Sequence, residues 1–340
     1  MKSECIVVTG RGGPEVLQRA ERDHTAGPGE ILIQVMAAGV SYGDVLARAG
    51  VIPGGPKPPY VPGFDVTGTV VACGPGVTSV RVGQPVTALV REGAYCDLVA
   101  VPAERAVPLP AGLDPIVCAA GILNSFIAWQ MLHRVAKVQR GSTILVHGAA
   151  GGVGLALVQL ARLHGVEVLG TCSAAKAEIV AREGARPIDY ETEDVLQVVR
   201  DVTQEGVAAA FDHIGGTHFL ISYACLRSPG ILVAYGQDRA LRNGKKFMPA
   251  GVVGFLGGII APKLVPDGKS TTFYNAWSLE TSEPLAYRAD LARVMDLMAR
   301  GRLRPILAGT VALESAADAH RALEGRTVRG KLVLVPGKAA

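Results

Sequence analysis

Close cysteine pairs are absent from this chain of 340 residues. The six cysteines lie far apart, at Cys5, Cys73, Cys96, Cys118, Cys172 and Cys225. Without a C-x-x-C pair the usual cysteine zinc sites are excluded, and we interpret the six thiols as reduced core residues. The first residues also lack the charged region, apolar core and cleavage site of a signal peptide. We therefore expect a cytoplasmic protein.

Runs of like charge and long apolar runs are missing as well. The formal net charge is +4, and the Lys and Arg residues are scattered along the chain. This pattern is not that of a nucleic-acid-binding protein, although it is compatible with an anionic ligand. The longest apolar stretch, Met248 to Pro262, is too short and too rich in Gly and Pro for a membrane span. We expect no membrane span and interpret this stretch as a packed or ligand-covering loop, with a contact to a membrane surface or to a second subunit as the alternative.

The composition is that of a folded protein with two domains. Hydrophobic residues make up 49% and charged residues 19% of a chain that is longer than one core usually requires. The first third has short strands separated by turns, which indicates a mostly β domain. From Ile122 strands alternate with helices, and this alternation predicts a parallel sheet with right-handed crossovers. Two further helices, Pro284 to Ala299 and Ala316 to Leu323, do not extend the repeat and can return to the first domain.

A glycine-rich turn stands between the first strand and the first helix of this alternating region. The sequence GAAGGVG contains Gly148, Gly151, Gly152 and Gly154. Glycine permits positive φ angles and a close approach of the backbone to a ligand. The amides of Gly152 and Val153 would point from the helix N-terminus at a pyrophosphate, aided by the helix dipole. The context of strand, turn and helix therefore predicts a dinucleotide site.

The end of the next strand indicates which dinucleotide binds. Proteins that prefer NAD usually have Asp or Glu there for the ribose hydroxyls, whereas this chain has LGTCSAAK. With no carboxylate to repel a 2′-phosphate, Ser173 can donate a hydrogen bond to it and Lys176 can supply a positive charge. Alternatively, Ser173 caps the next helix and Lys176 lies on the solvated face of that helix. Both interpretations can hold at once, and we predict NADPH as the cofactor.

Six segments together resemble a known family. They are GGPEVL at Gly12, AAGVSYGDVLARAG at Ala37, PYVPGFDVTGTVVACGPGVTSVRVGQPV at Pro59, HGAAGGVGLALVQLA at His147, FDHIGG at Phe211 and GKLVLVP at Gly330. Along nearly its whole length the chain is similar to the zinc-independent branch of the medium-chain dehydrogenase/reductase superfamily, the quinone oxidoreductase-like proteins. The second and fourth segments are the most specific of the six.

The resemblance implies an α/β fold with two domains. A doubly wound parallel Rossmann sheet, residues 122–261, would be inserted in a mostly-β GroES-like domain made of residues 1–121 and 262–340. It also implies a homodimer or homotetramer, and a cleft between the two domains. In such proteins NADPH gives a hydride to a quinone or to an activated C=C bond in an α,β-unsaturated carbonyl or enoyl thioester.

The resemblance further implies roles toward the cofactor for single residues. Lys176 and Tyr190 match neighbours of the 2′-phosphate, and Gly236 falls near the nicotinamide ribose. The residues that match the pyrophosphate turn are Gly151, Gly152 and Val153. Phe273 lies in TTFYNAW, where relatives have a strand that covers the cofactor and contacts a second subunit. The alternatives are a half-exposed aromatic that closes a strand for Tyr190 and a wall of the substrate site for Phe273.

Zinc is not expected. The zinc enzymes of the family carry Gly-His-Glu where this chain has Gly63-Phe64-Asp65, and they carry a four-cysteine cluster that is missing here. Polarisation of a substrate carbonyl must then come from hydrogen-bond donors. The resemblance places Ser41 and Asn124 toward the nicotinamide end of the cleft, and Tyr60 is a further phenol nearby. The alternatives are a turn cap for Ser41, a helix-start amide for Asn124 and a packing role for Tyr60.

Two departures from the family pattern concern activity. Ile52 and Ile127 stand where relatives often have Tyr and Thr, so two hydroxyl groups near the cofactor and the cleft are lost. We assign no side chain as the donor of the proton that follows hydride transfer, and bulk water is a candidate. The sequence therefore supports an NADPH-dependent reductase or, alternatively, an NADPH-binding protein of structural, trafficking or sensor role with little turnover.

Overall fold

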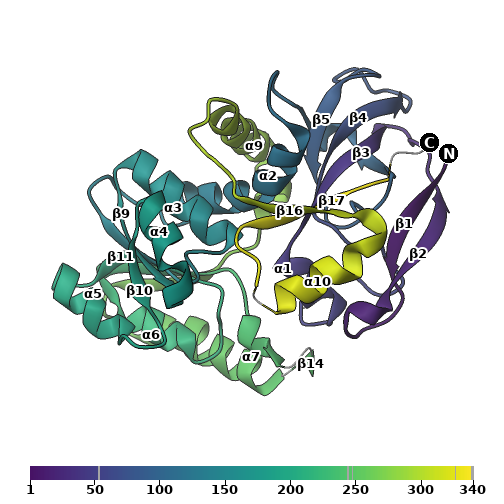
Figure 1. Ribbon diagram of the computed structural model, residues 1–340. Coiled ribbons are helices and arrows are strands. Elements are labelled where there is room, and N and C mark those ends of the chain that lie inside the picture. Colours follow the sequence, from purple (N-terminus) through teal and green to yellow (C-terminus); the bar gives the residue numbers. More distant parts are fainter. Residues whose placement is uncertain (53, 243–244, 247, 326, 338–340) are drawn as a thin grey trace. The chain divides into compact units, whose positions relative to one another are not determined.

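A computed structural model of the chain describes residues 1–52, 54–242, 245–246, 248–325 and 327–337 (Figure 1). The chain forms two compact units: unit 1 comprises Met1–Leu123 and Leu285–Ala340, and unit 2 comprises Asn124–Pro284. Unit 2 is thus inserted into unit 1 along the sequence. The structure moves the second boundary from residue 261 to Pro284, because the strand β15 (Lys269–Phe273) pairs with β12 (Leu226–Ala234) and extends the sheet of unit 2.

Unit 1 is built on a seven-stranded sheet that combines both ends of the chain. Its strands are β3 (Glu30–Val40), β4 (Asp65–Cys73), β5 (Pro85–Leu89), β6 (Leu98–Pro102), β7 (Ala106–Pro108), β16 (Leu307–Ala312) and β17 (Lys331–Val335). Their order is β16-β17-β3-β4-β5-β7, and β6 pairs with β3. A separate antiparallel pair joins β1 (Lys2–Val8) to β2 (Leu17–Asp23). The antiparallel pairing of β17 with β3 confirms that the C-terminal segment returns to the first domain.

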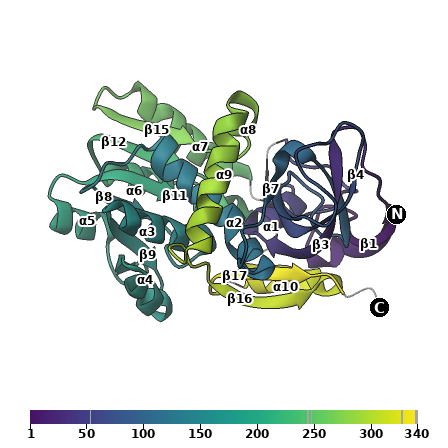
Figure 2. The same ribbon diagram turned by 90° about the horizontal axis from the view of Figure 1, so that it is seen from above.

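Unit 1 also contains helices, and two of them pack on inner strands of this sheet. The helices of unit 1 are α1 (Tyr42–Arg48), the first part of α2 (Pro115–Trp129), α9 (Pro284–Ala299) and α10 (Ala316–Glu324). α10 lies beside β16 in both views (Figures 1 and 2). Its buried residues Ala316 and Ala319 join a core cluster with Ile31 and Ile33 of β3. The expected helices after residue 284 are thus both present, and apolar burial rather than sheet extension determines where α10 lies.

Unit 2 contains a six-stranded parallel sheet. Its strands are β8 (Thr143–Val146), β9 (Glu167–Cys172), β10 (Arg186–Asp189), β11 (Val207–Asp212), β12 and β15. Their order is β10-β9-β8-β11-β12-β15, so the chain runs outward from β8 in one direction and then in the other. This is the doubly wound arrangement, and the direction reverses between β8 and β11. A short antiparallel pair, β13 (Leu241–Arg242) and β14 (Lys245–Lys246), follows β12.

Helices cover both faces of the parallel sheet (Figure 1). On one face, α5 (Val195–Thr203) and α6 (His218–Ala224) pack through Val199 and Phe219 into a cluster with Leu169 of β9. On the other face, α4 (Ala177–Glu183) follows α3 (Gly152–His164), and its Val180 packs over Gly170. Successive strand residues point to opposite faces, so Leu169 and Gly170 meet different helices. The Rossmann fold expected from the sequence is therefore confirmed.

Two apolar segments of the chain are helical. Pro115–Val135, which is α2 with a following wide turn, is long and apolar enough to cross a membrane by length and composition. Core helices of folded proteins pass the same test, and 72% of its most apolar window is buried. Met248–Pro262, expected as a loop, instead forms α7 (Met248–Phe255) and a helical continuation to Leu264. Helix formation satisfies the backbone amides of this apolar stretch internally.

Candidate functional site

The carboxyl ends of the parallel strands bring most of the predicted cofactor residues together. The pairing register aligns Cys172 with Asp189, and Asp212 with Ala234 and Phe273. The predicted residues at or after these ends are Gly148, Gly151, Gly152, Val153 and Gly154 after β8, Ser173 and Lys176 after β9, Tyr190 after β10, Gly236 after β12, and Phe273 at the end of β15. Ligands of open α/β sheets bind at this edge, beside the point where the strand order reverses.

The turn after β8 requires its glycines. Gly148 has a φ of +62°, which lies in the left-handed region. A Cβ at Gly154 would overlap the carbonyl oxygen of Gly148, so the first turn of α3 packs directly on the loop. Gly151 is the N-cap of α3, and its amide donates to Gly148 O over 2.9 Å. The first amides of a helix have no partner inside the helix, so this end of α3 can bind an anionic group.

Asn124 lies against this turn. It sits inside α2, so it is not the helix-start amide that was one of its alternatives. A Cβ at Gly152 would overlap Asn124 Nδ2, which places the side-chain amide on the Cα of the first residue of α3. Asn124 and the glycine turn therefore form one surface within unit 2.

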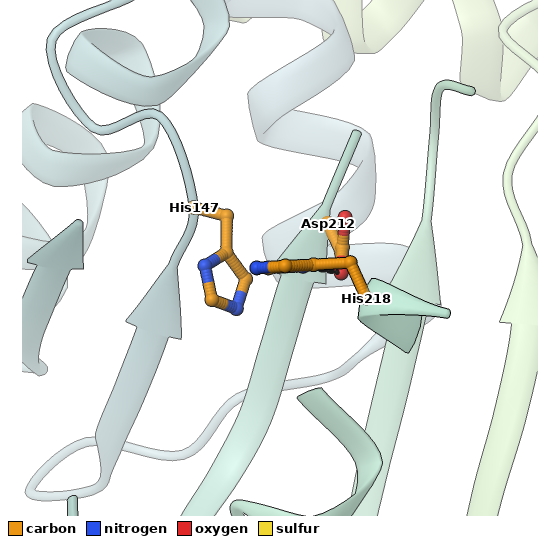
Figure 3. A group of neighbouring side chains, drawn as sticks. All are labelled: His147, Asp212 and His218. Carbon is orange, nitrogen blue, oxygen red and sulfur yellow. Dashed lines mark hydrogen bonds and ion pairs between the residues drawn. The ribbon is translucent and has the colours of Figure 1, made fainter. Parts of the chain in front are cut away.

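A buried hydrogen-bond network connects the glycine turn to the end of β11, and three of its side chains, His147, Asp212 and His218, are drawn in Figure 3. His147 is fully buried immediately before Gly148, and burial lowers the pKa of His147 to about 3, so its ring is neutral. Its Nδ1 lies 3.2 Å from Thr171 Oγ1, which also accepts from the Gly148 amide over 3.2 Å. Its Nε2 lies 3.1 Å from Ser222 Oγ, which donates to Asp212 Oδ2 over 2.5 Å. The donors and acceptors are consistent with one continuous series of hydrogen bonds from the Gly148 amide to the Asp212 carboxylate.

Asp212, at the end of β11, collects further donors. It accepts from the amide of Ile214 over 2.7 Å and the amide of Gly215 over 3.3 Å, and His218 Nδ1 lies 2.7 Å from its Oδ2. Burial alone would raise the pKa of Asp212, but the hydrogen bond with His218 and its other partners hold that pKa well below its usual range. The network therefore holds an anion beside the strands that carry the glycine turn.

The ends of β9 and β10 carry the residues predicted to recognise the 2′-phosphate. Ser173 and Lys176 belong to one tight turn, in which the Lys176 amide donates to Ser173 O over 2.8 Å. The Ser173 side chain makes no capping hydrogen bond, so the capping alternative is not observed. Tyr190 is 50% exposed, and its amide donates to Cys172 O over 3.3 Å. The half-exposed aromatic expected for Tyr190 is thus observed.

His213 lies at the same edge and was not predicted as a site residue. A Cβ at Gly148 would overlap His213 Nε2, so the imidazole packs directly on the glycine turn. Its Nδ1 pairs with Asp238 Oδ2 at 2.8 Å. A Cβ at Gly236 would lie 2.8 Å from His213 O, which brings that glycine into the same group. No local sequence pattern indicates this role for His213, because its neighbours Gly148, Gly236 and Asp238 are distant from it along the chain.

Phe273 ends β15 at the edge of the sheet. Its ring is 40% exposed and packs against Phe255 with ring centroids 5.9 Å apart. This position agrees with the edge strand that the sequence predicts.

In unit 1, Ser41 connects two buried groups. It is the N-cap of α1, and its amide donates to Asp44 Oδ2 over 2.9 Å, so the turn-cap alternative is observed in part. Its hydroxyl oxygen accepts from Lys331 Nζ over 2.6 Å. Lys331, on β17, is 4% exposed, and its Nζ lies 3.5 Å from Asp65 Oδ2. Lys331 and Asp65 are far from Ser41 in sequence and were not predicted as its partners.

A second chain of hydrogen bonds leads from Asp44 to α10. Tyr95 donates its hydroxyl to Asp44 Oδ2 over 3.3 Å, and its oxygen lies 3.3 Å from His320 Nε2. Arg48, which can only donate, lies 3.0 Å from His320 Nδ1 and also pairs with Glu324. His320 must therefore accept at Nδ1 and donate at Nε2. Burial lowers the pKa of His320 to about 3, and burial raises the pKa of Asp44 to about 7.

Tyr60 is not placed as a donor. It is 5% exposed, and it packs with Val8 and Ala47 in an apolar cluster that Ile52 also contacts. Its buried hydroxyl has no hydrogen-bond partner among the described residues. This position agrees with the packing alternative for Tyr60.

Comparison with family models gives two matches. A model described as an alcohol dehydrogenase GroES-like domain matches residues 27–111, and one described as a zinc-binding dehydrogenase matches residues 184–334. The residues at the expected zinc position do not fit that metal. Phe64 offers no ligand atom, and Asp65 faces the ammonium group of Lys331, which would repel a dication. His147, Asp212 and His218 offer three ligand atoms within 4.8 Å of one another. The Asp212 carboxylate, however, already has hydrogen-bond partners in the Ile214 amide, His218 and Ser222.

Three known proteins illustrate the similarity. The human synaptic vesicle membrane protein VAT-1 homolog is 31% identical over 340 residues, covering 98% of this chain and 86% of that protein. The 2-haloacrylate reductase of a Burkholderia species is 33% identical over 343 residues, 98% of each. The Escherichia coli quinone oxidoreductase solved with NADPH has a TM-score of 0.87 at 27% identity, covering 98% of this chain and 100% of that one. The chain therefore belongs to the medium-chain dehydrogenase/reductase superfamily, among its quinone oxidoreductase-like members.

Proposed function

We propose that this protein is an NADPH-dependent reductase that acts, without zinc, on an activated C=C bond or a quinone. The observation that carries the proposal is the carboxyl edge of the parallel sheet, where a glycine turn, an exposed helix N-terminus and Lys176 follow adjacent strands. NADPH supplies the hydride when it is bound there. The names of two relatives support the reaction class, since one is a 2-haloacrylate reductase and another is a quinone oxidoreductase solved with NADPH.

The residues of unit 2 fit the parts of this cofactor. The first amides of α3 suit the pyrophosphate, because they form a positive helix end beside a backbone without Cβ atoms. Ser173 and Lys176 suit the 2′-phosphate, and the end of β9 carries no carboxylate that would repel it. Asn124 can donate its amide protons to the nicotinamide end. These residues bind and orient the cofactor.

Unit 1 offers Ser41 as the donor to a substrate carbonyl oxygen. Its side chain is half-buried, and its oxygen already accepts a hydrogen bond from Lys331, so its own proton is available to a ligand. A donor aimed at developing negative charge stabilises the transition state more than the ground state. The proposed reaction thus needs no metal ion.

The test is consumption of NADPH with a panel of cyclic enones, acyclic enones, an enoyl thioester and simple quinones, with NADH as the control. We expect faster turnover with an enone or enoyl substrate than with a simple quinone, and little turnover with NADH. Preference for the quinones would make the quinone the acceptor. Equal rates with NADH would contradict the assignment of NADPH.

A second candidate function is supported by the similarity to the human synaptic vesicle membrane protein VAT-1 homolog. In this alternative the protein binds NADPH but turns over little, and it acts as a structural, trafficking or sensor protein. The loss of hydroxyl groups at Ile52 and Ile127 favours it. Micromolar binding of NADPH together with no oxidation of NADPH across the whole panel would favour this function over the reductase.

A further inference from the structure

Two cysteines of unit 1 lie directly opposite each other on adjacent backbone segments. Cys5 belongs to β1, and Cys96 lies in the segment that leads into β6. They form an isolated antiparallel bridge, although they are distant along the chain. Both residues are 1% exposed and belong to one core cluster of unit 1. The fold therefore brings two thiols together that no local sequence pattern pairs.

The backbone hydrogen bonds around this bridge determine the spacing of the two cysteines. Ile6 N–H donates to Tyr95 O over 2.9 Å, and Asp97 N–H donates to Glu4 O over 2.9 Å. Because the neighbours make these bonds, the cysteines themselves are a non-hydrogen-bonded pair. In such a pair the Cα atoms are about 4.5 Å apart, and both side chains stand on the same face. A disulfide needs Cα atoms about 4.4–6.8 Å apart, so the backbone here suits one.

The two thiols also interact with each other. Hydrogen bonding with Cys96 lowers the pKa of Cys5, an effect that burial opposes and Arg22 reinforces. The same contact raises the pKa of Cys96. By contrast, burial raises the pKa of Cys118 to about 11 and that of Cys225 to about 12. The thiolate is the reactive form of cysteine, so Cys5 is the member of the pair that reacts first.

The strand β2 covers Cys5 on one side. Cys5 Sγ donates to Ala20 O of β2 over 3.4 Å, and every residue of β2 is half-buried or exposed. The strands β1 and β2 form a separate two-stranded sheet, and such a sheet is marginally stable by itself. Local opening of β2 therefore gives a small oxidant access to the Cys5 thiol.

The geometry points to a reversible disulfide between Cys5 and Cys96, with hydrogen peroxide as the oxidant. The Cys5 thiolate attacks one peroxide oxygen, the O–O bond breaks, and Cys5 becomes a sulfenic acid. The Cys96 sulfur then attacks the Cys5 sulfur and displaces the hydroxyl group as water, so the S–S bond forms. The two sulfur atoms lose two electrons and the peroxide oxygens gain them. Two thiols and one peroxide thus give one disulfide and two water molecules.

This bond fastens the strand pair β1–β2 to the rest of unit 1. It closes a long loop of the chain, which restricts the unfolded state and so stabilises the folded one. It uses residues of unit 1 and needs no cofactor. The disulfide therefore does not depend on the proposed reductase function, and either can fail without the other.

Peptide mapping without reduction tests the bond. The protein is reduced with dithiothreitol, freed from it, treated with hydrogen peroxide, alkylated and digested with trypsin. Residues 3–11 and 92–105 form two tryptic peptides with one cysteine each. We expect peroxide to join them, at their summed mass less two hydrogen atoms, and dithiothreitol to separate them again. Peroxide-treated protein without these joined peptides overturns the proposal.

Matched variants show whether the linkage is specific. Cys5→Ala should yield no joined peptides, whereas Cys73→Ala, at a partly buried thiol of β4, should yield them as the wild type does. Other cysteine pairs joined to the same extent would mean unspecific oxidation and would contradict the assigned pair.

The unfolding temperature of the wild type measures the stabilisation and needs no variant. Peroxide-treated protein should unfold about 5 °C above the reduced protein, and dithiothreitol should remove the difference. Cys5→Ala should show no rise with peroxide. Joined peptides without a rise in the wild type would overturn the fastening of β1–β2.

Discussion

At the scale of a single residue, we propose that Lys176 sets which dinucleotide the protein prefers. It lies in one turn with Ser173 directly after β9. Neither the last residue of β9, Cys172, nor any residue of this turn carries an acidic group. A charge-assisted hydrogen bond to phosphate contributes about 1.5–3 kcal/mol, which corresponds to about 10–100-fold in binding. This residue is the sharpest test of the cofactor assignment, because NADH lacks the group that it would contact.

We predict that Lys176→Ala weakens NADPH binding about 10–100-fold and changes NADH binding less than about 2-fold. The measurement is titration of each coenzyme by fluorescence at fixed ionic strength. Arg182→Ala, which removes an exposed charge from the neighbouring helix α4, is the matched control and should change neither constant. Equal losses for both coenzymes would contradict a role for Lys176 at the 2′-phosphate.

His320 makes the stability of unit 1 depend on pH. Burial, with Arg48 beside it, lowers the pKa of His320 to about 3, whereas an unfolded histidine titrates near about 6.5. At pH values above about 6.5, His320 is neutral in both the folded and the unfolded chain, so it does not change the free energy of unfolding. As the pH falls from about 6.5 toward about 3, the unfolded chain takes up a proton that the folded chain does not. The free energy of unfolding therefore falls with acid by about 1.4 kcal/mol per pH unit from this group.

We predict that His320→Gln flattens this dependence between about pH 6 and about pH 4, because glutamine cannot take up a proton in the unfolded state. The variant loses stability at pH 8, by about 1–3 kcal/mol, since Arg48 and Tyr95 lose a buried partner. Urea unfolding at a series of pH values measures both effects. Parallel pH profiles for the variant and the wild type would show that His320 is not the titrating group.

At the scale of elements, the strand-turn-helix unit at β8 and α3 depends on backbone contacts that only glycine allows. We predict that Gly154→Ala lowers NADPH affinity by more than about 10-fold and lowers stability by about 1–3 kcal/mol, because the added Cβ would overlap the Gly148 carbonyl oxygen. NADPH titration and urea unfolding are the measurements. Gly257→Ala is the control, since a Cβ there meets nothing within 4 Å, and it should change neither value. Normal NADPH affinity in Gly154→Ala would contradict the packed turn.

Much of this element scale is visible in the sequence, because local patterns specify it. Helices α9 and α10 start at the expected residues, and the glycine turn lies where the apolar strand ends. The second domain boundary is not visible in this way. It depends on the pairing of β15 with β12, and β15 is a short polar strand, so no local pattern indicates that pairing. Likewise, Met248–Pro262 is helical although its glycines and prolines favour a loop.

At the scale of the whole molecule, an open sheet edge suggests association. β15 is the last strand of its sheet and has no strand on its other side among the described residues. Apolar side chains are exposed on the segment before it and at its end: Val253 (62%), Leu256 (55%), Ile260 (40%), Leu264 (83%), Val265 (50%) and Phe273 (40%). An open edge beside exposed apolar groups is a favourable surface for pairing with a second copy.

We predict a homodimer formed at β15. Light scattering during size-exclusion chromatography should give about twice the 35.3 kDa of one chain. Leu256→Lys with Leu264→Lys should convert the dimer to a monomer, because two charges would then have to be buried in the interface. Leu285→Lys, at an equally exposed leucine outside the segment, is the control and should leave the dimer intact. A wild-type monomer would contradict this interface.

The α/β fold, the glycine turn and the residues that follow the strands can be recognised from the amino-acid sequence, because each depends on neighbours within a few positions. Three other features become visible only in the folded chain: Tyr60 is a core residue, His213 packs on the glycine turn, and Lys331 contacts Ser41 across 290 residues of sequence. These contacts join strands that are adjacent in a sheet but distant along the chain. Burial then decides which polar groups must pair, and no local spacing records that choice.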